Sequence, residues 1–504
     1  MERTEMEINR PGTKDFLMAR KAAVAGIFGS VLLAGAHQAV AAGWEISPNV
    51  TLSETFLDNS GQALTDQSNH EYVSEVTPSL GVRKEGRRVK LSALYRLQNL
   101  WYSNASDLDN SYQQYAASVN AELLRKVLFL DLSTTRTQQI IDPNNVVTFD
   151  NLATTSNRTD VTTYSAKPSY AHQFGDFAEA RVNGSFDHVS YSDSATADSD
   201  NIGYFASLAS GNRFDRVDWV GSFKRVEFLQ RQNKNDEYYQ TLLLDFGYKF
   251  RKRLTFIAGV GYENSNIQNT DTGESGGSWK IGAKWEPTPR TSVTGTVGQR
   301  FFGNSASFQL VHQQKTSQLR INFVQNITHV SQLALGNNVF DSTFANTNTG
   351  GGGNTTVLTP NVPAVSENIS SPSITTGLFL SKRWSASYIK KTHRSLFNLR
   401  GFHENRELTV GGTNENVFGG DSSWAWAIGS RTTSTLSGRW ERQKLAAAGK
   451  QDDDIWSAGV EITHQIGKNS QGSIGARRVK RDSPSSALNY EQTQIALKLV
   501  IGLY

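Results

Sequence analysis

The chain has 504 residues, of which 37% are hydrophobic and none is Cys, and its mean hydropathy is −0.46. This composition is too polar for a bundle of membrane-spanning helices, and the lack of Cys excludes disulfides, thiolate metal sites and an N-terminal lipid anchor. The net charge of +4 balances 51 basic against 47 acidic residues, so charge gives no argument for nucleic-acid binding.

Residues 1–41 have the three parts of a secretory signal peptide. Arg20 and Lys21 precede an apolar run over residues 22–36, and Ala39-Val40-Ala41 is a small-x-small cleavage site. The run is shorter than the roughly 20 residues that a spanning helix needs. We therefore expect a mature chain of residues 42–504. Met18 is an alternative start, because residues 1–17 add nothing to the signal.

The mature chain alternates apolar and polar residues in one segment after another. In residues 242–249, for example, Leu242, Leu244, Phe246 and Tyr248 occupy every second position. The last segment, residues 495–503, alternates in the same way before the chain stops at Tyr504. A period of two is typical of a β-strand with one apolar face. Behind an export signal, this pattern predicts a closed antiparallel transmembrane β-barrel in an outer membrane.

The connections between these segments alternate between long and short, as in barrels with short periplasmic turns and long external loops. An even strand number places both ends of the barrel in the periplasm, which predicts 22 strands, with 20 or 24 as alternatives. This count treats residues 374–390 as one bulged strand and predicts a later external loop over 407–421. The longest loop, residues 329–372, is expected to be mobile outside the barrel or to fold into the pore.

We expect the last strand to close the barrel against a first strand that starts near Trp44. Its apolar face, Ile495 to Leu503, then meets lipid, while Lys498 and Gly502 face inward. Tyr504 departs from this pattern, because it lies one position off the lipid-facing face.

Strand parity also predicts which charged side chains point into the lumen. Their mixed signs predict a polar interior without strong ion selectivity, although cross-strand ion pairs that only stabilise the wall would look the same. The candidate lumen-lining residues are Lys90, Arg96, Glu122, Asp131, Glu179, Arg181, Asp187, Asp245, Lys249, Arg300, Arg320, Arg400, Glu404, Arg439 and Glu441.

The sequence offers little for catalysis. His188 and Ser190 share one strand face, but no third member of a catalytic triad follows from the sequence. Metal-ligand spacings and phosphate-binding glycine loops are missing, so we expect no enzymatic activity, cofactor or metal. A TonB-type receptor would need a large N-terminal plug, and we expect no room for one because strand-like alternation begins within a few residues of the cleavage site.

One stretch resembles a known family. Gly277 to Thr291, with Trp279, Trp285, Pro287 and Pro289, and its continuation Gly298 to Gly303 are similar to the outer-membrane β-barrel family associated with the PEP-CTERM and exosortase system of Gram-negative bacteria. The segment from Ile46 to Asn59 and the last strand from Tyr490 are similar to the beginning and end of that family.

The resemblance implies a barrel that serves exopolysaccharide production, so we expect export or secretion of a surface polysaccharide. It carries over no catalytic residues. The expected partners are outer-membrane lipid, the barrel-assembly machinery, a polysaccharide and periplasmic export components. A general porin or solute uptake channel, and a structural or assembly barrel that conducts little, are the alternatives.

Overall fold

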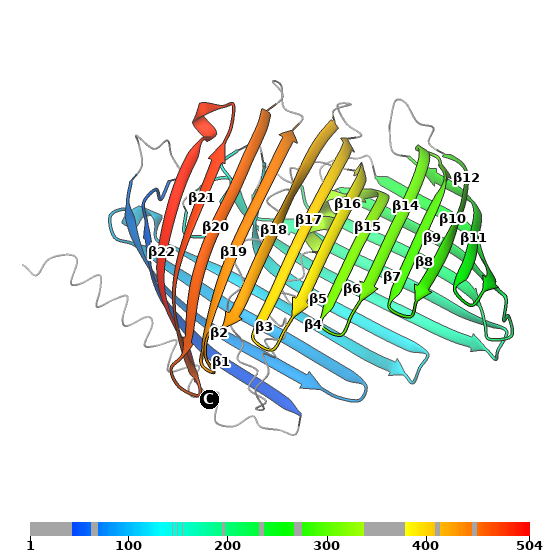
Figure 1. The fold of residues 1–504 in the computed structure, drawn as a ribbon, viewed down its shortest axis with the longest axis horizontal. Coiled ribbons are helices and arrows are strands. Elements are labelled where there is room, and N and C mark those ends of the chain that lie inside the picture. The colour runs from blue at the N-terminus through cyan, green and yellow to red at the C-terminus, as the bar shows by residue number, and fades with distance from the viewer. Residues whose placement is uncertain are drawn as a thin grey trace, which may run out of the picture.

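The computed structural model describes residues 43–503, except 62–68, 144, 149, 154, 194–196, 231–235, 267–274, 337–377, 409–413 and 446–450. Twenty-two β-strands form one antiparallel barrel, which confirms the predicted fold class and strand number (Figure 1). The first eleven strands are β1 (Trp44–Leu57), β2 (Glu71–Glu85), β3 (Val89–Tyr102), β4 (Asn110–Leu124), β5 (Leu128–Ile140), β6 (Arg158–Phe174), β7 (Ala178–Tyr191), β8 (Ser199–Ser210), β9 (Val217–Gln230), β10 (Glu237–Arg251) and β11 (Leu254–Ser265). The others are β12 (Ser275–Thr288), β13 (Thr291–Arg300), β14 (Gly303–Gln313), β15 (Ser317–His329), β16 (Leu378–Lys391), β17 (Ser395–Leu408), β18 (Asn414–Ala427), β19 (Thr432–Leu445), β20 (Gln451–Gln465), β21 (Ser470–Asp482) and β22 (Tyr490–Gly502).

Within the described ranges, three short helices lie in connections between strands. They are η2 (Ser106–Leu108), α2 (Val330–Gly336) and η3 (Ser486–Leu488). Among the described residues, no helix is long and apolar enough to cross a membrane.

The barrel closes where the sequence predicts. Each strand pairs with the next one along the chain, and β22 returns to pair with β1, from Leu57 opposite Gln494 to Asn49 opposite Gly502. Ile495 and Leu497 are about half exposed on the outer face, as expected for side chains that meet lipid. Tyr504 lies outside the described residues.

The stretch predicted as one bulged strand is a regular strand, β16. Its residues pair without a register shift with β15 on one side and β17 on the other. The expected bulge is therefore wrong, because the alternation of this strand already fits both neighbours. The loop predicted over 407–421 is also too long, since β17 continues to Leu408 and β18 begins at Asn414. Many strands run past the roughly 9–11 residues that cross the hydrocarbon layer, so their ends are polar and resemble loops in sequence.

The two faces of the wall differ as the alternation requires. On β10, Leu242, Leu244 and Phe246 are exposed on the outside, whereas Thr241 on the opposite face is 6% exposed. The ten short turns all lie at one end of the barrel, where the C-terminus also lies (Figure 1). Because short turns face the periplasm in outer-membrane barrels, the long connections lie on the external side.

Candidate functional site

The residues that were predicted to line the lumen lie on strand faces that point away from the exposed apolar belt. Two pairs within this set meet, since Arg181 Nε lies 2.5 Å from Glu179 Oε1 and Arg439 Nη2 lies 2.9 Å from Glu441 Oε2. No ion pair joins Lys90, Arg96 or Arg320 to another described residue. The other members contact residues outside the set: Glu122 with the Lys126 amide, Asp131 with Asn120, Asp187 with Ser165, Asp245 with Lys280, Lys249 with Asp218, Arg300 with Glu263, Arg400 with Asp421, and Glu404 with Arg383 and Arg406. Most charges on this wall are thus neutralised by neighbours, and a role for these residues in a conducting pore stays a prediction.

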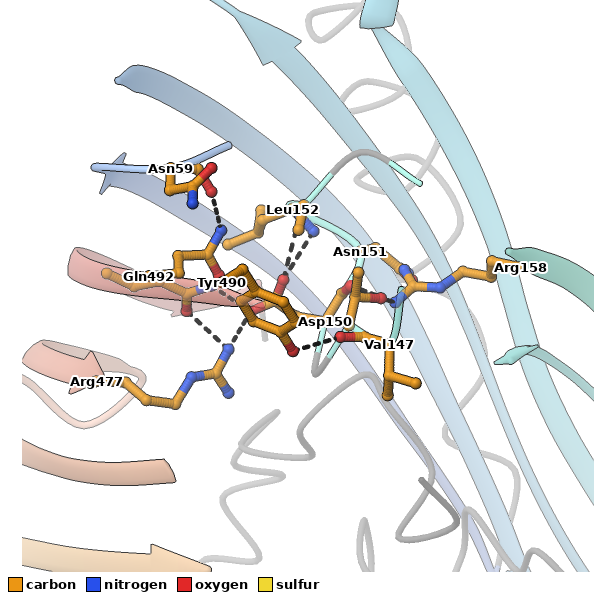
Figure 2. Close-up of polar contacts among 12 residues, drawn as sticks. Asn59, Val147, Asp150, Asn151, Leu152, Arg158, Arg477, Tyr490 and Gln492 are labelled. Carbon is orange, nitrogen blue, oxygen red and sulfur yellow. Dashed lines mark hydrogen bonds and ion pairs between the residues drawn. The ribbon is translucent and has the colours of Figure 1, made fainter. Parts of the chain in front are cut away.

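The most distinctive interior feature is the connection between β5 and β6. Its described residues within 141–157, named here the inward segment, contact the interior faces of β3, β20, β21 and β22. Figure 2 shows this segment beside Arg477 of β21 and Tyr490 of β22. Six strands separate β5 from β20 around the wall, since the order there is β20, β21, β22, β1, β2, β3, β4, β5. The inward segment therefore crosses this part of the interior as a chord.

Asp150 is the charged contact at the centre of the inward segment. It forms an ion pair with Arg477 of β21 (Figure 2), and it accepts a hydrogen bond of 2.9 Å from the Gln494 amide of β22. Burial would raise the pKa of Asp150, but the charge of Arg477, the Gln494 hydrogen bond and the charge of Arg158 outweigh burial and hold this pKa below its ordinary value. Asp150 is therefore ionised when the segment is docked.

A second charged contact fixes the start of the inward segment. Arg481 of β21 and Asp453 of β20 form a fully buried ion pair. The same guanidinium donates hydrogen bonds to the backbone carbonyls of Pro143 and Asn145. Neither carbonyl lies in a helix or strand, so Arg481 supplies hydrogen-bond donors to backbone oxygens that no sheet partner satisfies.

Apolar contacts complete the docking. Val147 packs with Ile455, Val479 and Tyr490, and each of these side chains is 2% exposed or less. The Tyr490 hydroxyl also donates a hydrogen bond of 2.6 Å to the Val147 carbonyl (Figure 2). The apolar packing and this hydrogen bond together hold Val147 against the interior faces of β20, β21 and β22.

The inward segment is shaped from its own end by Arg158, the first residue of β6. The Arg158 guanidinium donates hydrogen bonds to Thr148 Oγ1, the Asp150 carbonyl and Asn151 Oδ1. Asn151 in turn donates a hydrogen bond of 2.8 Å to Gln98 Oε1 of β3. Figure 2 shows Asn151 and Arg158. One arginine thus holds the bend that presents Asp150 to Arg477.

A second interior contact follows β15. The His329 ring stacks on Phe228 of β9 with ring centroids 4.6 Å apart. Asn201 of β8 donates a hydrogen bond of 3.0 Å to Ser331 Oγ of α2. Because β9 and β15 are not adjacent in the sheet, these contacts cross the interior. The beginning of the predicted loop 329–372 therefore contacts β8 and β9, several strands away around the wall, while residues 337–372 lie outside the described residues.

Arg300, from the stretch that resembles a known family, organises a third cluster. Its Nε lies 2.9 Å from Oε1 of Glu263 on β11, a side chain that is 1% exposed, and its guanidinium also bonds the Tyr239 hydroxyl. The guanidinium stacks over Phe302 at 4.6 Å. A buried carboxylate needs such a partner, so Arg300 and Glu263 act as one structural unit.

Sequence reasoning missed several of these residues for different reasons. Arg477, Arg481 and Asp453 lie on inward-facing positions, so parity alone would have found them. Asp150 lies in a segment without periodicity, and no signal in the sequence marks it.

The candidate catalytic residues do not form a triad. Asp200 Oδ1 lies 2.6 Å from His188 Nδ1, but no hydrogen bond joins Ser190 to this histidine in the part of the chain that the structure describes. No group of three His, Cys, Asp or Glu side chains suited to a metal ion occurs among the described residues.

No family model matches the chain, and no curated protein matches it. Solved structures do. One is a variant of the ferric enterobactin receptor of Pseudomonas aeruginosa in complex with enterobactin, with a TM-score of 0.51, 9% identity, and 91% of this chain and 81% of that chain covered. Another is the siderophore receptor PirA from Acinetobacter baumannii, with a TM-score of 0.50, 8% identity, and 91% and 80% covered. The protein is an outer-membrane β-barrel.

The expectation of exopolysaccharide export is wrong. The solved structures that share this barrel are named as a ferric enterobactin receptor and a siderophore receptor, and they give no support for a polysaccharide or for periplasmic export components as partners. The alternative of solute uptake agrees better with these neighbours. The physical reason for the error is that a wide polar lumen suits many solutes, and short structural motifs do not specify which one passes.

Proposed function

We propose that this protein takes up small polar solutes across the outer membrane through its own lumen, which the inward segment narrows. The observation that carries the proposal is the docking of Asp150 on Arg477 across a polar interior. A barrel of 22 strands is wide enough for an aqueous lumen unless protein fills it. A docked chord reduces that width and leaves less space for large solutes.

The wall suits hydrated solutes of either sign. Charged side chains such as Asp245 and Lys280 form pairs across strands, at 2.8 Å in this case, so they provide polarity with little net charge. Paired charges in contact with water keep a pore wet without binding one ion strongly. We therefore expect weak ion selectivity and a cut-off by solute size.

A second candidate is receptor-type uptake, in which a ligand binds the external side with high affinity and a partner opens the barrel. The likeness in fold to receptors for ferric enterobactin and siderophores favours this candidate. About a fifth of each of those receptors has no aligned counterpart in this chain.

Reconstitution separates the candidates. Liposomes that contain the pure protein should swell in small sugars and not in large oligosaccharides. Impermeable liposomes together with tight binding of a ferric siderophore would favour the receptor. Impermeable liposomes without binding would favour a structural or assembly barrel and would overturn the proposal. Membership of the PEP-CTERM-associated family and insertion by the barrel-assembly machinery stay predictions.

A further inference from the structure

The charges at the two ends of the barrel differ sharply. The ten short turns contain thirteen basic and two acidic residues, whereas the described residues of the long connections contain eight Asp and no Lys or Arg. The thirteen basic residues, named here the basic rim, are Arg87, Arg88, Arg125, Lys126, Arg213, Arg216, Lys252, Arg253, Arg290, Lys315, Arg394, Arg431 and Lys468.

The basic rim is not neutralised by the protein. None of its members forms an ion pair with a described residue. Other cations on the outer face near the external end do, as Arg442 does with Asp454 at 2.7 Å and Lys444 with Asp452 at 2.9 Å. Thirteen like charges crowded at one end repel one another, so an anionic partner would stabilise them.

The rim is densest over three successive turns. Arg213, Arg216, Arg251, Lys252, Arg253 and Arg290, named here the basic arc, are all exposed and lie at the periplasmic ends of β8 to β13, with Asp215 as the single acidic residue in the same turns. In Figure 1 these strand ends lie at the lower right of the barrel.

Aromatic side chains show how deep the basic arc lies in the membrane. Arg251 lies 5.4 Å above the Phe250 ring, which itself packs near Phe256. Trp219 packs with Phe177 and Phe214 in the neighbouring turns. Exposed aromatic rings at strand ends mark the boundary between hydrocarbon and headgroups, so cations just beyond them lie at the level of lipid phosphates.

We infer that the basic rim binds the headgroups of anionic phospholipids in the periplasmic leaflet. Basic residues occur in nine of the ten turns, around the whole barrel. A leaflet surrounds a barrel on every side, whereas a protein partner on one side would need charges only there. Guanidinium and ammonium groups at a membrane surface attract acidic lipids through charge–charge contacts that salt weakens. This inference does not depend on which solutes pass through the lumen.

The chain carries its own reporters for a test, because Trp219 and Trp285 lie beside the basic arc. The protein is reconstituted in phosphatidylcholine with either brominated phosphatidylglycerol or brominated phosphatidylcholine, and tryptophan quenching gives the relative association of the two lipids. We expect phosphatidylglycerol to be preferred by about threefold or more at low salt, and less at high salt.

The test variant replaces all six residues of the basic arc with Gln. Near Trp219 and Trp285, we expect the ratio of phosphatidylglycerol to phosphatidylcholine association to fall towards one. The matched control replaces six outward-facing, ion-paired cations near the external end with Gln. They are Arg136, Arg225, Arg442, Lys444, Arg478 and Lys480. We expect the control to keep the preference for phosphatidylglycerol. Equal quenching by both lipids in the unmodified protein, or an unchanged preference in the arc variant, would overturn the inference. Binding of a polyglutamate peptide to the rim without any lipid preference would assign it to an acidic polypeptide instead.

Discussion

Asp150 and Arg477 are 327 positions apart in the chain, and they form an ion pair inside the barrel. Asp150 belongs to the connection between β5 and β6, and Arg477 belongs to β21 on a distant part of the wall. This pair ties an irregular segment to a rigid strand. Because the segment crosses the interior, the free energy of this contact decides how often that part of the lumen is narrowed.

Replacing Asp150 with Asn should weaken the docking. The variant keeps the shape of the side chain and loses the charge that Arg477 and Gln494 recognise, at a cost of about 1–3 kcal/mol. We expect single-channel recordings to show larger or more frequent open states. The control is Asp218→Asn, which breaks the more exposed interior pair with Lys249 and should leave the open states unchanged. Identical recordings for Asp150→Asn and the unmodified protein would count against docking by this pair.

The docking should resist mild acid. The pKa of Asp150 is held below its ordinary value, so the stabilisation is complete above the ordinary Asp pKa of about 3.9 and is lost only as the pH falls through the lowered pKa. Conductance should therefore stay constant from pH 7 to about 4 and rise below that. In Asp150→Asn this rise should be absent, and the same acid rise in both proteins would show that another group is responsible.

The stability of the barrel should fall more when Arg481 alone is replaced than when Arg481 and Asp453 are replaced together. Arg481→Met leaves a buried carboxylate without its cation, which costs about 3–5 kcal/mol, and also removes donors to the Pro143 and Asn145 carbonyls. The double variant Arg481→Met with Asp453→Leu should recover part of this stability in urea unfolding of the barrel in detergent. Additive losses in the double variant would contradict coupling between the two side chains.

The cluster at Arg300 should matter for the stability of the barrel. Arg300→Leu strips the buried Glu263 carboxylate of its partner, so we expect a loss of about 3–5 kcal/mol in urea unfolding. Asp421→Asn, which breaks the more exposed Arg400 pair, should cost about 0.5 kcal/mol or less. Similar losses for the two variants would mean that burial of Glu263 is not the deciding factor.

The sequence was informative for features that depend on the alternation of residues along a strand. Alternation and the even strand number predicted that β22 would pair with β1, and they placed Ile495 and Leu497 on the outer face. The same rule placed Arg300 opposite the apolar face. It could not supply Glu263, because this partner comes from β11, two strands away, and needs the relative stagger of three strands.

The docking of the inward segment could not be predicted from the sequence, for a different reason. Val147 and Asp150 lie in residues without periodicity, and their partners Tyr490 and Arg477 follow more than 300 positions later. Such contacts depend on closure of the barrel, which brings the ends of the chain together and places β20 to β22 within reach of the connection after β5. Trp219 is a smaller example, because its place among the aromatic residues of the periplasmic boundary depends on the neighbouring turn that contains Phe177.

We propose that the lumen admits small polar solutes and that the inward segment narrows it. The most direct test is the permeability of liposomes that contain the pure protein to a graded series of sugars, compared with a variant that has residues 143–155 replaced by a short Gly-Ser linker. We expect the unmodified protein to pass small sugars only and the linker variant to pass larger ones as well. Liposomes impermeable with both proteins, or the same size limit for both, would contradict it.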